Sequence, residues 1–112
     1  MGVVRLLPTL NRKNTRLMLK MPLTLPTIEC ARAVRDGGID AMAALNEALR
    51  EAIERLTPTQ ADELKVAFGR VMGDLVEDII NPAINAFPEL DPDPATWIAV
   101  AKARAAARCD AV

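Results

Sequence analysis

The sequence contains no serine, no histidine and no tyrosine, and these absences exclude many kinds of active site. Histidine is the commonest general base and the commonest metal ligand among the side chains. Serine supplies the nucleophile of hydrolase triads. Two thiols remain, Cys30 and Cys109, but no imidazole is available to activate either of them. We therefore expect a protein that is not an enzyme.

The two cysteines are also too few for a structural metal site or a disulfide framework. Cys30 and Cys109 lie far apart, and neither has a second cysteine within a few positions. We expect two reduced thiols, as in a cytoplasmic protein, and neither a metal nor a cofactor. No apolar run approaches the roughly 18 residues that a membrane span requires, so we expect no membrane segment.

Aromatic residues are scarce, since Phe68, Phe87 and Trp97 are the only three. The core of this 112-residue chain must then come from aliphatic side chains and many alanines, which suits closely spaced helices in one small domain. A small core of this kind is often completed by a second subunit. We therefore expect a homo-oligomer, most simply a homodimer.

Helix start and stop signals divide the chain from Thr27 onward into four predicted helices. Gly37-Gly38 and then Asp40 separate the first helix from the second, because glycine favours helix ends and aspartate favours helix starts. Thr57-Pro58-Thr59-Gln60 has the pattern of a capping box and opens the third helix. The predicted helices span about 27–36, 40–56, 58–80 and 94–109.

The predicted fold is an all-α helical bundle built on a helical hairpin. The second and third helices are joined by a very short turn, so they should lie antiparallel. Asn81-Pro82 is expected to end the third helix, and residues 82–93, with three prolines, to form a partly extended connector. Alternatively, Asn81-Pro82 starts one short turn through Phe87. Asp93 and Pro94 then cap and begin the last helix, which flanks the hairpin as the first one does.

Residues 1–26 fall outside the helical pattern and are predicted as an N-terminal arm, with residues 27–112 as a single helical domain. The alternation of Leu17, Leu19 and Met21 with other residues also suits a β-hairpin around a polar turn. The arm has no acidic residue and could contact nucleic-acid phosphates, although the acidic remainder of the chain disfavours a dedicated binder. Its basic residues are Arg5, Arg12, Lys13, Arg16 and Lys20.

The opposite charge gathers in residues 71–101, which contain no lysine or arginine. Asp74 and Asp78 lie one turn apart near a predicted helix C-terminus, where the helix dipole disfavours negative charge. Solvent, a basic partner or a cation could offset this charge. Trp97 nearby is either a core anchor or a hot spot for a partner. The candidate partner-binding acidic surface comprises Asp74, Glu77, Asp78, Glu89, Asp91 and Asp93, with Trp97.

Gly69 and Gly73 lie one turn apart inside the third predicted helix, although glycine there costs about 1 kcal/mol relative to alanine. Two glycines at this spacing form a groove that another helix can approach closely. That helix belongs either to the same chain or to a second copy, so this pair is predicted to be a helix-packing or dimer face.

These features favour a non-catalytic protein–protein interaction module, such as a small bacterial or phage-type adaptor, inhibitor or immunity-like protein, that acts through the acidic surface. The alternative is a small nucleic-acid-associated regulator that binds phosphates through the basic arm. A carboxylate-based metal protein is a more distant third interpretation.

Overall fold

The computed structural model describes residues 23–111, and 85% of these are helical with no strand among them. The elements are α3 (Ile28–Ile53), α4 (Pro58–Leu75), the π-helical segment η2 (Val76–Ile80), α5 (Asn81–Ala86), the 3-10 turn η3 (Pro88–Leu90) and α6 (Pro94–Ala111). The prediction of a small all-α bundle is confirmed. The five basic residues of the arm, and the β-hairpin considered for it, lie outside the described residues.

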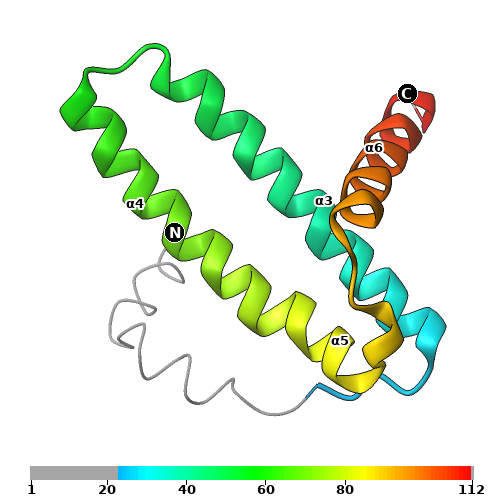
Figure 1. The fold of residues 1–112 in the computed structure, drawn as a ribbon. Coiled ribbons are helices and arrows are strands. Elements are labelled where there is room, and N and C mark those ends of the chain that lie inside the picture. The colour runs from blue at the N-terminus through cyan, green and yellow to red at the C-terminus, as the bar shows by residue number, and fades with distance from the viewer. Residues whose placement is uncertain (1–22, 112) are drawn as a thin grey trace, which may run out of the picture.

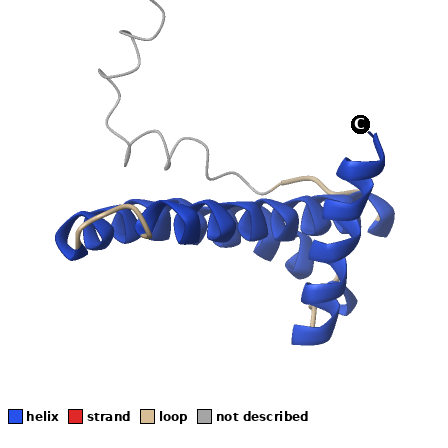
Figure 2. Ribbon diagram, turned by 90° about the horizontal axis from the view of Figure 1, so that it is seen from above, coloured by secondary structure: helices blue, strands red, loops and turns tan. Residues whose placement is uncertain are grey.

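Helices α3 and α4 form the predicted antiparallel hairpin (Figure 1). The capping box is present at the start of α4: the Gln60 amide donates to Thr57 Oγ1 at 3.2 Å, and the Thr57 amide donates to Gln60 Oε1 at 3.1 Å. Pro58 occupies the first turn, where its missing N–H leaves no bond unmade. Seen edge-on, the hairpin is a single layer of two helices, and α6 crosses its plane near one end (Figure 2).

Helix α3 runs without a break through Gly37 and Gly38, so the prediction of two helices at 27–36 and 40–56 is wrong. No described glycine has a positive φ, which means that neither glycine acts as a helix stop. Gly38 is instead buried against η2, and a Cβ added there would lie 2.5 Å from Ile80 Cγ1. The glycine permits close packing between two segments that are distant in the sequence.

The helix that begins at Pro58 also continues beyond Asn81-Pro82, where the sequence predicted its end. A proline ring within a helix collides with the carbonyl four positions earlier, which here belongs to Asp78. The wider turn of η2 changes that register: the Asn81 amide donates to the carbonyl of Val76, five positions back. Helix α5 and η3 replace most of the extended connector predicted for 82–93, and α5 matches the alternative of a short turn before Phe87.

The core lies at the end of the hairpin where α3 begins and α4 passes into α5. Ala31, Ala83 and Leu90 are buried there, and Leu25 packs against them, so part of the predicted arm belongs to the helical fold. Ile39 and Ile80 are the largest fully buried side chains. The other end of the hairpin is different: residues 40–57 include no buried residue, and Ala61 is the only one in α4.

Candidate functional site

The predicted acidic surface is spread over several elements at the core end of the hairpin (Figure 1). Asp74 is half-buried on α4, and Glu77 and Asp78 are exposed on η2. Each of these three residues already takes part in an interaction within the structure. Glu89 is exposed on η3 and Asp91 on the loop that follows it. A partner that binds this surface would meet carboxylates from two sections of the chain, before and after α5.

Asp93 and Trp97 have local structural roles as well. The Thr96 amide donates to Asp93 Oδ1 at 2.7 Å, so Asp93 caps α6 as predicted. This backbone bond, together with a contribution from the Thr96 hydroxyl, lowers the pKa of Asp93 below its ordinary value. Trp97 is half-buried on the first turn of α6, which leaves one part of the indole packed and another in solvent.

Gly69 and Gly73 lie on an exposed part of α4, and a Cβ added at either position would have no neighbour within 4 Å. Packing against another helix of the same chain is therefore not their role among the described residues. Val66, 55% exposed, lies three positions before Gly69 and hence on the same side of α4. The dimer-face interpretation remains as a prediction.

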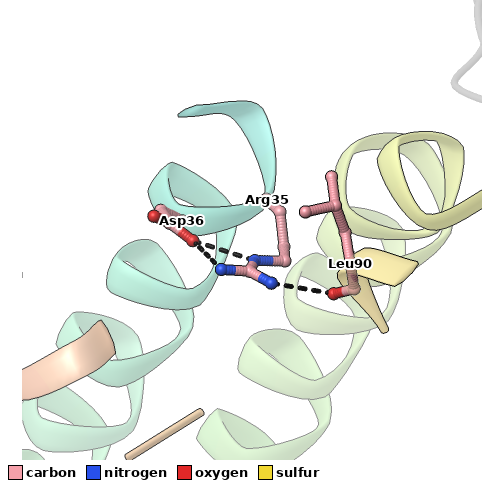
Figure 3. A network of polar contacts seen from close by, with 3 residues as sticks. All are labelled: Arg35, Asp36 and Leu90. Carbon is pink, nitrogen blue, oxygen red and sulfur yellow. Dashed lines mark hydrogen bonds and ion pairs between the residues drawn. The ribbon is translucent and has the colours of Figure 1, made fainter. Parts of the chain in front are cut away.

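Arg35, which was not among the residues predicted from the sequence, is buried and links η3 to α3. The Arg35 side chain is 9% exposed; its Nη2 lies 2.7 Å from Asp36 Oδ1, and its Nε donates to the same oxygen at 2.9 Å (Figure 3). Its Nη1 donates to the Leu90 carbonyl at 2.9 Å. The sequence contains one indication of this role. Arg35 lies four positions from Ala31 and from Ile39, which places it on the buried face of α3.

Asp40 does not cap a second helix, as the sequence predicted, because it lies in the interior of α3. Its carboxylate instead joins α3 to α6. Arg108 Nη1 donates to Asp40 Oδ2, and Arg104 Nε lies 4.0 Å from the same oxygen. The bond to Asp40, together with its negative charge, raises the pKa of Arg108. The sequence signal was the pair Arg104 and Arg108, one helical turn apart, but nothing local pointed to Asp40 as their partner.

The described residues do not support the metal-binding interpretation. Between residues 23 and 111, no three His, Cys, Asp or Glu side chains, Asp74, Glu77 and Asp78 included, come close enough together to hold a metal ion. Cys30, half-buried, and Cys109, exposed, are both free thiols. No helix in the described part of the chain combines the length and apolarity needed to cross a bilayer.

Comparison with protein-family models, with curated protein sequences and with solved structures gives no match for this chain, so its function is inferred from its own residues.

Proposed function

We propose that this chain is a non-catalytic protein–protein interaction module that binds a basic partner through its acidic surface. The observation that carries the proposal is the separation of charge along the chain: residues 71–101 carry six carboxylates and no lysine or arginine. Five of the six are exposed at this end of the molecule, and only Asp74 is half-buried; the five are Glu77, Asp78, Glu89, Asp91 and Asp93. An unbalanced surface of this kind attracts and orients a partner of opposite charge.

The structural role of each carboxylate indicates how it can contribute to binding. Asp93 is already used as the cap of α6, so its charge is fixed in place by the Thr96 amide. Asp74, Glu77 and Asp78 already have interactions, which an incoming lysine or arginine must displace or join. Glu89 and Asp91 lie on η3 and the loop after it, a segment that Arg35 holds against α3. The partner therefore meets a surface whose backbone is largely fixed before binding, which limits the entropy lost.

In biological terms, this activity corresponds to a small cytoplasmic adaptor, inhibitor or immunity-like protein of bacterial or phage type. We further propose that the chain forms a homodimer in which the exposed face of α4 around Gly69 and Gly73 meets a second copy. The half-buried Trp97 at the start of α6 would then contribute apolar contact area at the edge of the acidic surface.

The proposal is tested by affinity capture from the native host with three baits that differ only in charge. The triple variant Asp74→Lys, Glu77→Lys and Asp78→Lys should lose a partner that the wild type retains, because complementary charge becomes repulsive. A matched control, Glu47→Lys, Glu51→Lys and Glu54→Lys, makes the same change of charge at exposed positions in and just after the C-terminal part of α3, distant from this surface. Circular dichroism must show equal helicity in all three proteins. Capture of the same partner by the first variant would refute the proposal.

A further inference from the structure

Helix α6 is attached to the rest of the molecule mainly through α3, and few of its own side chains are covered. None of its residues from Pro94 to Cys109 is buried. Thr96, Trp97, Val100 and Ala101 are half-buried in its first two turns, and every side chain from Lys102 to Cys109 is exposed. Apolar packing therefore holds the beginning of α6 but not its second half.

The second half of α6 is held to α3 by charge. Arg108 and Arg104 both approach Asp40 Oδ2, and Arg104 Nη2 also lies 3.5 Å from the position that a Cβ on Gly37 would occupy. The two arginine side chains are 58% and 47% exposed, so solvent and salt reach this ion pair and weaken it.

One oxygen of Asp40 has no partner while α6 is docked. Asp40 Oδ1 is buried and has no hydrogen-bond partner among residues 23–111, whereas Oδ2 accepts from Arg108. A buried acceptor without a partner opposes the state in which it is buried. If α6 moved away, water would reach both oxygens of Asp40, so the loss of the ion pair would be partly offset.

Helix α6 also has what it needs to remain helical away from α3. Its N-terminus is capped by Asp93 and begins with Pro94, and neither feature depends on α3. It has 18 residues, many of them alanine, which is the best helix former and needs no tertiary contact to favour the helix. The non-helical residues 91–93, between η3 and α6, provide the place where the chain can turn.

We propose that α6 is a releasable helix, which docks on α3 through the apolar contacts of its first two turns and the ion pair of Asp40 with Arg104 and Arg108, and which moves away as a folded unit more often when that pair is broken. Release uncovers the carboxylate of Asp40 and the backbone at Gly37. The molecule thus has a docked and a released form whose balance depends on ionic strength and on any charged group that competes for Asp40.

Two variants of the full chain break the ion pair from opposite sides: Asp40→Asn, and the double variant Arg104→Gln with Arg108→Gln. Amide hydrogen exchange measured by mass spectrometry should show residues 96–109 exchanging roughly fivefold faster in both than in the wild type at low salt, because the hydrogen bonds of a helix without tertiary support open briefly more often while its mean helicity is unchanged. Emission from Trp97, the only tryptophan, should shift to longer wavelength as its environment becomes more polar. In the wild type, 1 M NaCl should produce the same two changes.

Arg50→Gln is the matched control, because it removes an exposed ion pair with Glu47 on α3, 3.4 Å long, without touching α6. Its exchange in residues 96–109 and its Trp97 emission should equal those of the wild type. Unchanged exchange in both ion-pair variants and at high salt would overturn the proposal. A loss of helicity at 222 nm accompanying the release would also overturn it, since α6 would then be unfolding rather than moving as a helix.

Discussion

Gly38 and Gly73 both lie in helices with φ angles that alanine readily adopts, so the backbone alone would accept a Cβ at either position. Their surroundings differ. A Cβ at Gly38 would lie 2.5 Å from Ile80 Cγ1 and 3.2 Å from its Cδ1, whereas one at Gly73 would meet nothing within 4 Å. At the scale of single residues, the effect of a helical glycine on stability depends on whether another segment packs against its backbone, and the sequence alone does not show such a contact.

Alanine at these two positions should therefore have opposite effects. Gly38→Ala should destabilise the fold by about 1–3 kcal/mol, because Ile80 must leave its preferred position in a packed core. At a protein concentration low enough to keep the chain monomeric, Gly73→Ala should stabilise it by up to about 1 kcal/mol, because alanine is the better helix former and meets no obstacle within the chain. Urea unfolding of both variants beside the wild type gives the two differences. A destabilised Gly73→Ala monomer would contradict this account of α4.

At the scale of secondary-structure elements, the helix starts follow from short-range chemistry. Thr57 with Gln60 at α4 and Asp93 at α6 act as caps at the positions that the sequence indicated. Thr27 caps α3 in the same way, accepting from the Cys30 amide at 3.1 Å. The predicted ends of the first and third helices were wrong, because Gly37-Gly38 and Asn81-Pro82 are accommodated by contacts and by a register change that lie beyond local signals.

The capping role of Asp93 predicts that the stability of the fold depends on pH. Since the Thr96 amide lowers the pKa of Asp93 in the folded chain, the charged cap stabilises α6 above the ordinary Asp pKa of 3.8. That stabilisation should be lost as the pH falls through the lowered folded value. Asp93→Asn keeps a capping oxygen without a titrating group and should not show the loss. Thermal unfolding of both proteins between pH 2 and 6 gives the difference.

The pKa of Asp93 can also be measured directly. A carboxyl NMR titration of Asp93 should give an apparent pKa below 3.8 in the folded protein. An ordinary or raised value would show that the bond from the Thr96 amide is not formed in solution.

At the scale of the whole molecule, the buried residues are unevenly distributed between the two ends of the hairpin. One end of the hairpin contains Ala31, Ile39, Ile80, Ala83 and Leu90, and Arg35 bridges α3 to η3 beside them. The other end, from Ala41 through the turn to Phe68, contains Ala61 as its only buried residue. A single layer of two helices leaves their facing apolar side chains only half covered there, and protein domains ordinarily need a second layer to bury such a stripe.

Amide hydrogen exchange should reflect this gradient. Amides of residues 31–42 and 79–86 should exchange at least about tenfold more slowly than those of residues 46–70, because local opening of the distal end exposes little apolar surface. The proposed homodimer adds a condition: exchange around Gly69 and Gly73 should slow as protein concentration rises from about 10 to about 500 µM. Distal exchange that does not depend on concentration would contradict the dimer, and uniform exchange would contradict the gradient.

The proposed acidic surface and the proposed docking of α6 also belong to this scale, since each depends on charges from more than one element. The exposure of Glu77, Asp78, Glu89 and Asp91 could be expected from the sequence, because charged side chains in a segment without basic residues ordinarily remain in solvent. The roles of Arg35 and Asp40 were not identified, because the bond of Arg35 to Leu90 and the ion pairs of Asp40 with α6 join residues more than 50 positions apart.

The sequence by itself determined the helical class, the hairpin and the caps of α4 and α6, because all of these follow from interactions between residues a few positions apart. Only the tertiary structure decided that α3 passes through Gly37-Gly38, that the next helix continues beyond Pro82, and that Asp40 binds α6 rather than starting a helix. The physical reason is common to the three: a glycine, a proline or an aspartate inside a helix is tolerated according to what lies against it in space, and a local pattern contains no information about that neighbour.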